Sequence, residues 1–321
     1  KIRQSIMDKK EDVKDDAWGS GVIGKIIVVL LAVYLLVSVI VGMYWSSEPD
    51  AFSVREHTRS VANSMAREPV TGFATTVTMI RIAETLLEKP GGYLSNDIFP
   101  PGVWLDNMPS WEFGVLVQLR DLSRAMRKDI ARSQSQSAED PDLTIAEPQF
   151  HFDSGSWAIP STEAEYRRGI EALKRYLNRL SSPEQANAQF YARADNLANW
   201  LGDLETRIGS LSRTLGESVG KASVSDAVAN VDMDNPLQEE TGGVDVKTPW
   251  TKIDDVFYEA RGSSWALLHI FRAIEVDFRK VLRDKNAMSS VKQVIIELEG
   301  AQGSMWSPVV LNGHGFGVLA N

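Results

Sequence analysis

The sequence predicts an all-α protein: a single N-terminal transmembrane helix, followed by an elongated helical bundle that contains a coiled-coil hairpin. Three observations support this fold class. First, one run near the N-terminus is apolar and free of charge. Second, apolar residues recur at steps of three and four in five later segments. Third, strand patterns are nearly absent, and only residues 149–160, QFHFDSGSWAIP, could form a short extended piece.

The transmembrane helix is predicted at Ile26–Trp45, IIVVLLAVYLLVSVIVGMYW. Twenty helical residues span roughly 30 Å, which is the hydrocarbon thickness of a bilayer. Lys25 at one end and Tyr44 with Trp45 at the other are the residue types that anchor a helix at membrane interfaces. Membrane lipid is therefore an expected partner. A buried core helix and a cleaved signal peptide fit less well, because the run lacks a polar face and is longer than a signal core.

The charges that flank this segment predict its direction. Lys9, Lys10, Lys14 and Lys25 precede it, whereas only Arg55 and Arg59 follow within twenty residues. Under the positive-inside rule, residues 1–25 form a cytoplasmic tail and residues 46–321 lie outside the cytoplasm. In a Gram-negative bacterium this places the protein in the inner membrane, with its larger part in the periplasm.

Residues 46–142 are expected to form a membrane-proximal helical region. Two apolar stripes predict its helices, and KPGG at residues 89–92 ends the first. Ser110 is the expected N-cap of the second helix, with Glu112 in its first turn. The stripes comprise Phe73, Val77, Ile80, Ala83 and Leu87, then Trp111, Val115, Leu119, Leu122, Met126 and Ile130.

Residues 143–321 are expected to contain the coiled-coil hairpin and a long-helix bundle. Thr162 and Glu165 suggest a capping box for the first helix of the hairpin, and the second is expected from about Pro183 to Glu217. Residues 218–250 are rich in acids and predict a flexible crossover. A third helix, capped by Thr251 and Asp254, would complete a three-helix bundle, with Gly262 marking a close helix crossing or a kink.

Residues 96–114, NDIFPPGVWLDNMPSWEFG, form an unusual loop rich in proline and aromatic residues. Pro100 restricts the backbone, and Trp104 and Trp111 are too apolar to remain in water as a group. We expect both tryptophans to be buried structural residues. A docking face for a partner protein is the alternative.

Few residues point to catalysis or cofactor binding. The chain has no cysteine, and its formal charge of -9 argues against a nucleic-acid partner. The four histidines lack ligand spacing, and His269 is expected on the flank of its helix. DMDNPLQEE at residues 232–240 lacks the glycine of a calcium loop, and GHGFG at residues 313–317 lacks the context of a phosphate loop. No metal or cofactor is predicted.

Two stretches resemble a family of Gram-negative bacterial proteins known only as a domain of unknown function. They are residues 91–124, GGYLSNDIFPPGVWLDNMPSWEFGVLVQLRDLSR, and residues 249–282, PWTKIDDVFYEARGSSWALLHIFRAIEVDFRKVL. The resemblance implies one N-terminal membrane anchor and a periplasmic helical domain. It implies no activity and assigns no catalytic residue.

The expected function is that of a non-enzymatic envelope scaffold or assembly factor that acts through helical contacts. A homo-oligomer is expected, and other envelope proteins are possible partners. The alternative is a peptidoglycan hydrolase, or its accessory, that uses an acid beside the aromatic loop, such as Glu112 or Asp106. The predicted oligomer seam consists of Leu197, Leu204, Ile208, Leu211 and Leu215.

Overall fold

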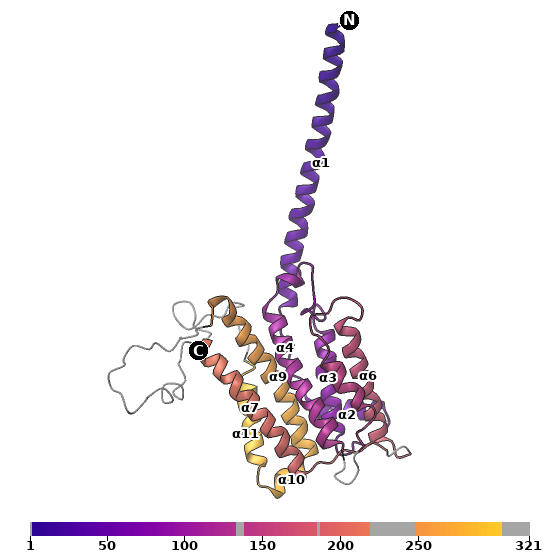
Figure 1. Ribbon diagram of the computed structural model, residues 1–321, viewed down its shortest axis with the longest axis vertical. Coiled ribbons are helices and arrows are strands. Elements are labelled where there is room, and N and C mark those ends of the chain that lie inside the picture. Colours follow the sequence, from indigo (N-terminus) through magenta and orange to yellow (C-terminus); the bar gives the residue numbers. More distant parts are fainter. Residues whose placement is uncertain (1, 133–137, 185–186, 219–247, 304–321) are drawn as a thin grey trace, which may run out of the picture.

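The computed structural model describes residues 2–132, 138–184, 187–218 and 248–303, and this described part is helical without a strand (Figure 1). The all-α prediction is confirmed. Residues 232–240 and 313–317, and most of the predicted acidic crossover, lie outside the described residues. The α-helices are α1 (Ile2–Trp45), α2 (Val54–Ser64), α3 (Phe73–Glu88), α4 (Asn107–Ala125), α5 (Leu143–Phe150), α6 (Thr162–Ser181), α7 (Ala194–Ser218), α9 (Ile253–Asp277), α10 (Arg279–Asp284) and α11 (Met288–Gly300). Three short elements are η1 (Gly102–Trp104), the π-helix η2 (Met126–Ile130) and η3 (Trp250–Lys252).

Helix α1 projects alone from a body formed by the other helices (Figure 1). Its segment Ile23–Trp45 is long and apolar enough to cross a membrane, with a mean hydropathy of 3.1, and only 11% of its most apolar 18-residue stretch is buried. The segment is therefore not a core helix of the body. It is compatible with a membrane anchor or a signal sequence.

Helices α4 and α9 pack along each other through the centre of the body (Figure 1). Their backbones approach closely at Gly114 and Gly262. A Cβ atom at Gly114 would collide with the Glu259 carbonyl, and one at Gly262 would collide with the Trp111 carbonyl. The close crossing predicted at Gly262 is confirmed, because only glycine allows this approach.

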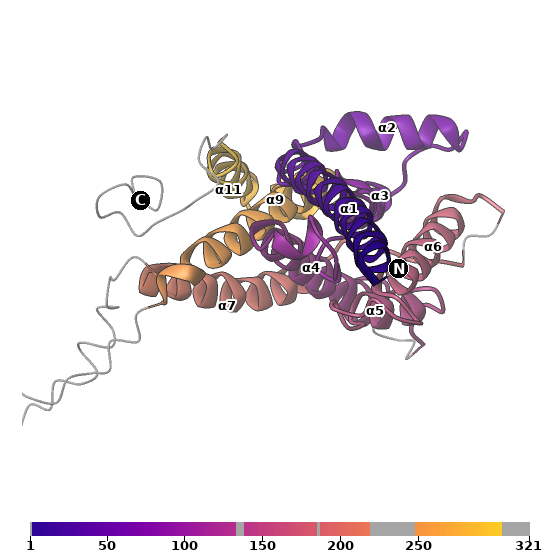
Figure 2. The same cartoon turned by 90° about the horizontal axis from the view of Figure 1, so that it is seen from above.

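The remaining helices surround this pair. Helix α3 packs between α9 and α6, and α5 covers α6 and α4. Helices α7 and α11 both contact α9 and lie on different sides of it, while α2 lies at the edge of the body outside α3 (Figure 2). One hydrophobic core joins residues from both sides of position 142, and it includes every residue of the two stripes predicted before that position.

The prediction that α6 and α7 pair with each other as a coiled-coil hairpin is wrong. Helix α6 packs on α3 and α5, whereas α7 packs on α4 and α9. The second helix begins at Ala194 rather than near Pro183, because residues 187–193 carry the chain across the body in a non-helical segment. Tyr176 Oη donates to the Gln189 carbonyl at 2.7 Å, and Tyr191 N donates to the Ile130 carbonyl at 2.8 Å. The expected three-helix bundle is replaced by this arrangement.

Three predicted helix caps also differ from the structure. Asp106, not Ser110, caps α4, and Pro109 is tolerated because first-turn amides have no partner within the helix. Ser161 caps α6 through Ala164 N, one residue before the predicted Thr162. Thr251 lies in η3, before α9 begins.

Candidate functional site

Glu112 was expected in the first turn of its helix, but it lies beyond the first turn of α4, and its carboxylate is completely buried. The Lys89 ammonium lies 2.6 Å from Oε1, and both side chains have no exposed surface. Leu94 N donates to Oε1 at 2.8 Å, and Ser95 donates to Oε2 from N at 2.9 Å and from Oγ at 2.5 Å. The carboxylate therefore fixes the turn that follows α3 to the start of α4.

This geometry removes Glu112 as the acid of a hydrolase. Burial raises the pKa of Glu112, against the opposing effects of Lys89, Ser95 and Leu94. A raised pKa suits a general acid, but both oxygens already accept hydrogen bonds and no substrate can reach them. Asp106 is exposed and remains the accessible acid beside the aromatic loop.

The aromatic loop places its two tryptophans in different environments. Trp111 is fully buried, with its ring centroid 5.3 Å from that of Trp265, as expected. Trp104 is 51% exposed, so the expectation that it is a core residue is wrong. It lies in η1, which contacts α1, and Tyr34 Oη in α1 donates to the Pro100 carbonyl at 3.3 Å. The loop therefore rests against α1.

The predicted interfacial anchors lie at both ends of the apolar segment. Lys25 and Tyr44 are exposed. Trp45 is partly buried against Gly91, whose φ of +86° and contact with the indole ring both favour glycine.

The segment that follows α1 is held against α9 by three side chains, Arg261, His269 and Arg272, which we call the α9 clamp. Arg261 forms an ion pair with Glu48 at 2.5 Å. Phe52 N donates to His269 Nε2 at 3.0 Å, and Arg272 donates to the Phe52 carbonyl at 3.2 Å. Spacings of eight and three residues place these side chains along one side of α9.

His269 is the central residue of the clamp and is fully buried, not on a helix flank as expected. Its Nδ1 lies 2.7 Å from the Trp265 carbonyl oxygen. Because a carbonyl can only accept, Nδ1 carries the proton, and the unprotonated Nε2 accepts the hydrogen bond from Phe52 N. Its ring also stacks on Phe52 at 3.9 Å. Burial lowers the pKa of His269 to about 4, and Arg272 acts in the same direction. The histidine is therefore neutral at pH 7.

The clamp also joins a third part of the chain. Arg261 donates to the carbonyls of Ala301 and Gly303, which follow α11, at 3.0 and 3.1 Å. Sequence reasoning missed this set of residues. The signal was present, because three polar side chains follow one another at steps of eight and three on a largely apolar helix. Their partners Glu48 and Phe52, however, lie more than 200 residues away in the sequence.

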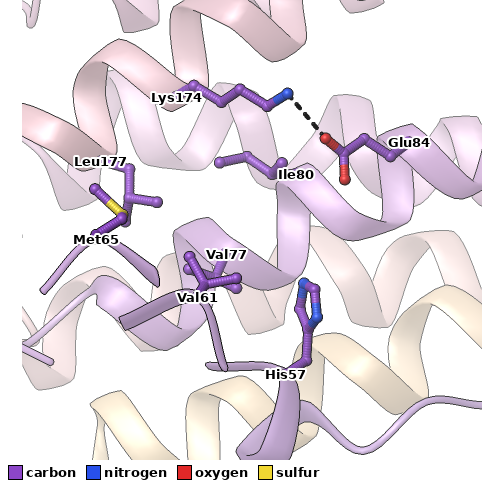
Figure 3. A pocket seen from close by; sticks show the side chains of 8 residues that line it. All are labelled: His57, Val61, Met65, Val77, Ile80, Glu84, Lys174 and Leu177. Carbon is purple, nitrogen blue, oxygen red and sulfur yellow. Dashed lines mark ion pairs between the residues drawn. The ribbon is translucent and has the colours of Figure 1, made fainter. Parts of the chain in front are cut away.

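A groove of about 320 Å³ lies between α2, α3 and α6 (Figure 3). Its walls are mainly apolar, and Lys174 forms an ion pair with Glu84 at 3.0 Å. Burial lowers the pKa of His57, and Arg81 adds to this effect. Within the described residues, no three acidic or histidine side chains are grouped so as to hold a metal ion. The groove is lined by His57, Val61, Met65, Val77, Ile80, Glu84, Lys174 and Leu177.

The predicted oligomer seam on α7 is covered only along its first half. Leu197 and Leu204 are buried in the body. Ile208 is 43% exposed, and Leu211 and Leu215 are half-buried. The seam therefore starts inside the body and emerges toward the end of α7.

The model of the family described as "Uncharacterized protein conserved in bacteria (DUF2333)" matches residues 18–321. No curated protein and no solved structure matches the chain.

Proposed function

Because the chain belongs to this bacterial family described as uncharacterised, we propose its function from the structure: a membrane-anchored, non-enzymatic scaffold of the bacterial envelope. Helix α1 would anchor it in the inner membrane, and the body would present helical surfaces to other copies or to other envelope proteins.

The α9 clamp is the observation that carries this proposal. An enzyme domain on a flexible tether needs no fixed orientation relative to its anchor. Here only eight residues separate α1 from α2, and three α9 side chains bind Glu48 and Phe52 within that segment. A body fixed to its membrane helix holds its surfaces at a set height and angle, which is what a scaffold requires.

A periplasmic location for the body is the second part of the proposal. The four lysines before the apolar segment support a cytoplasmic N-terminus. Protease added to spheroplasts is expected to digest the body, whereas an inverted-vesicle preparation should protect it. The opposite pattern would overturn the location.

The hydrolase alternative has a direct test on the intact protein. Full-length protein in detergent should release no soluble fragments from purified peptidoglycan. If the wild type releases soluble fragments and Asp106→Asn does not, with the melting temperature unchanged, the protein is an enzyme and the scaffold proposal is refuted. Asp106 suits this test better than Glu112 because its substitution does not leave a buried lysine unpaired.

Self-association through the emerging end of the α7 seam is the third part of the proposal. Burial of one leucine or isoleucine stabilises a contact by about 1.5–3 kcal/mol, and confinement to a membrane raises the effective concentration of a second copy. Native mass spectrometry of detergent-extracted protein should show a closed oligomer that Ile208→Glu dissociates. Ser210→Glu, an exposed polar position on the same helix, is the matched control. A wild type that is monomeric at micromolar concentration would refute this part.

A further inference from the structure

Residues 98–105, IFPPGVWL, form a loop without a charged residue between Asp97 and Asp106. Several of its large apolar side chains are in contact with solvent. Phe99 is 73% exposed and Trp104 is 51% exposed, and Ile98 and Val103 are similarly open. A contiguous apolar surface of this kind on a folded protein marks a place where something other than water binds.

The loop lies beside the end of α1 that is nearest the body (Figure 1). Pro101 and Leu105 lie over Gly42, where an added Cβ atom would be 3.5 Å from Pro101 Cβ and 3.8 Å from Leu105 Cδ2. One turn earlier, Ser38 is 3% exposed, whereas almost all other side chains between residues 23 and 45 are open. Gly42, and Tyr34 two turns earlier, therefore mark the side of α1 against which the loop packs, and the buried Ser38 lies between them on that side.

This position falls inside the apolar segment and not beyond its end. The segment Ile23–Trp45 has 23 residues, and a bilayer core requires about 20. Every window of 20 residues within it contains both Ser38 and Gly42. At about 1.5 Å per residue, Gly42 lies within about 5 Å of the edge of the hydrocarbon layer, on its inner side, and Ser38 lies about 6–10 Å inside it.

The backbone of the loop is suited to this depth, where carbonyls cannot bind water. Four consecutive carbonyls each accept a hydrogen bond. Phe99 O accepts from Val103 N at 3.2 Å, Pro101 O from Trp104 N at 3.0 Å and Gly102 O from Leu105 N at 2.9 Å. Pro100 O accepts from Tyr34 Oη at 3.3 Å, and the two prolines have no amide to satisfy.

A second apolar tip lies next to this loop. Asn96 Nδ2 donates to the Ser156 carbonyl at 2.9 Å and to Glu163 at 3.0 Å, which ties the loop to the turn before α6. That turn exposes Trp157, and Trp157, Trp45 and Phe99 line the same open surface. Tryptophan favours the membrane interface, so Trp157 is placed at the rim.

We propose that residues 98–105 insert into the leaflet nearest the body and that lipid covers Phe99, Val103 and Trp104. The occupant is the bilayer that α1 crosses, because the loop is continuous with the apolar surface of α1. The inference rests on the proposed membrane anchor. It adds a second, non-helical membrane contact, which would fix the rotation of the body about α1 as well as its height.

The absence of cysteine from the chain allows single nitroxide labels at chosen positions. Full-length Phe99→Cys and Val103→Cys, in vesicles of phosphatidylethanolamine and phosphatidylglycerol, are compared with two reference positions. Leu36→Cys reports on α1, and Val294→Cys is an exposed apolar position on α11, which packs on α9. Collision rates with oxygen, which partitions into lipid, and with a water-soluble nickel chelate are measured at each label.

The loop labels are expected to show a several-fold higher ratio of oxygen to nickel collisions than Val294→Cys, with a depth between the interface and Leu36→Cys. Lipid exposure at Leu36→Cys with water exposure at both loop labels would overturn the inference and leave the anchor intact. Water exposure at Leu36→Cys as well would overturn the anchor itself.

Discussion

At the scale of single residues, two buried ionisable groups of the body, Glu112 and His269, are held by specific partners. The Glu112 carboxylate accepts hydrogen bonds from four donors, and neutral His269 donates one hydrogen bond and accepts another. Sequence alone could not identify either arrangement. Lys89 precedes Glu112 by 23 positions, and Phe52 precedes His269 by 217, so no local spacing links the partners.

Removal of one partner from the Lys89–Glu112 pair should be strongly destabilising. Lys89→Met leaves a buried carboxylate without its cation, which costs about 3–5 kcal/mol. Lys174→Met is the matched control, because Lys174 pairs with Glu84 at a partly exposed site where an ion pair contributes about 0–1 kcal/mol. Urea unfolding measures both. Equal effects of the two substitutions would contradict the structural role of Glu112.

His269 should make stability depend on pH. Its pKa is about 4 in the folded protein against 6.5 for the free side chain. Below pH 6.5 the unfolded state binds a proton that the folded state does not, so stability falls as the pH drops from 6.5 to about 4. At about pH 4 and below, the free energy of unfolding is lower by about 3 kcal/mol, whereas above pH 6.5 it is not lowered.

The variant His269→Gln, which retains an acceptor but does not titrate, isolates this effect. His57 and the buried acids contribute in both proteins, so the difference between the two stability–pH curves belongs to His269. Parallel curves between pH 4 and 6.5 would show that His269 is not buried as a neutral group.

At the scale of helices, the apolar stripes could be predicted but the pairing could not. The steps of three and four placed the buried residues of α3 and α4 correctly, because burial of one face imposes that period. The stripe does not specify which helix covers it. Residues 187–193 move α7 to α4 and α9, and that segment has no periodic signal.

The crossing of α4 and α9 should be sensitive to a single methyl group. Gly262→Ala forces Cβ against the Trp111 carbonyl and is expected to cost about 1–3 kcal/mol, as overpacking does. Gly209→Ala on α7, where nothing lies within 4 Å, should instead stabilise by about 0.5–1 kcal/mol. Thermal unfolding distinguishes the two, and stabilisation by both would contradict the close approach.

At the scale of the whole molecule, the apolar helix and the all-α class were accessible from sequence because each depends on composition and local period. The relation between α1 and the body was not accessible. Trp104 shows why: its size and apolarity predict removal from water, and they do not distinguish a protein core from a surface beside α1.

The central claim is that the α9 clamp fixes the body to α1, the proposed membrane anchor. The most direct measurement is the distance distribution between spin labels at Leu36→Cys in α1 and Val70→Cys in the body, by pulsed electron paramagnetic resonance on full-length protein in bilayers. We expect one narrow distribution that broadens when Arg261 and Arg272 are replaced by alanine, and that is unchanged by Arg168→Ala on the exposed face of α6. A broad distribution in the otherwise unaltered protein would show that the body moves freely about its anchor, and would contradict the account.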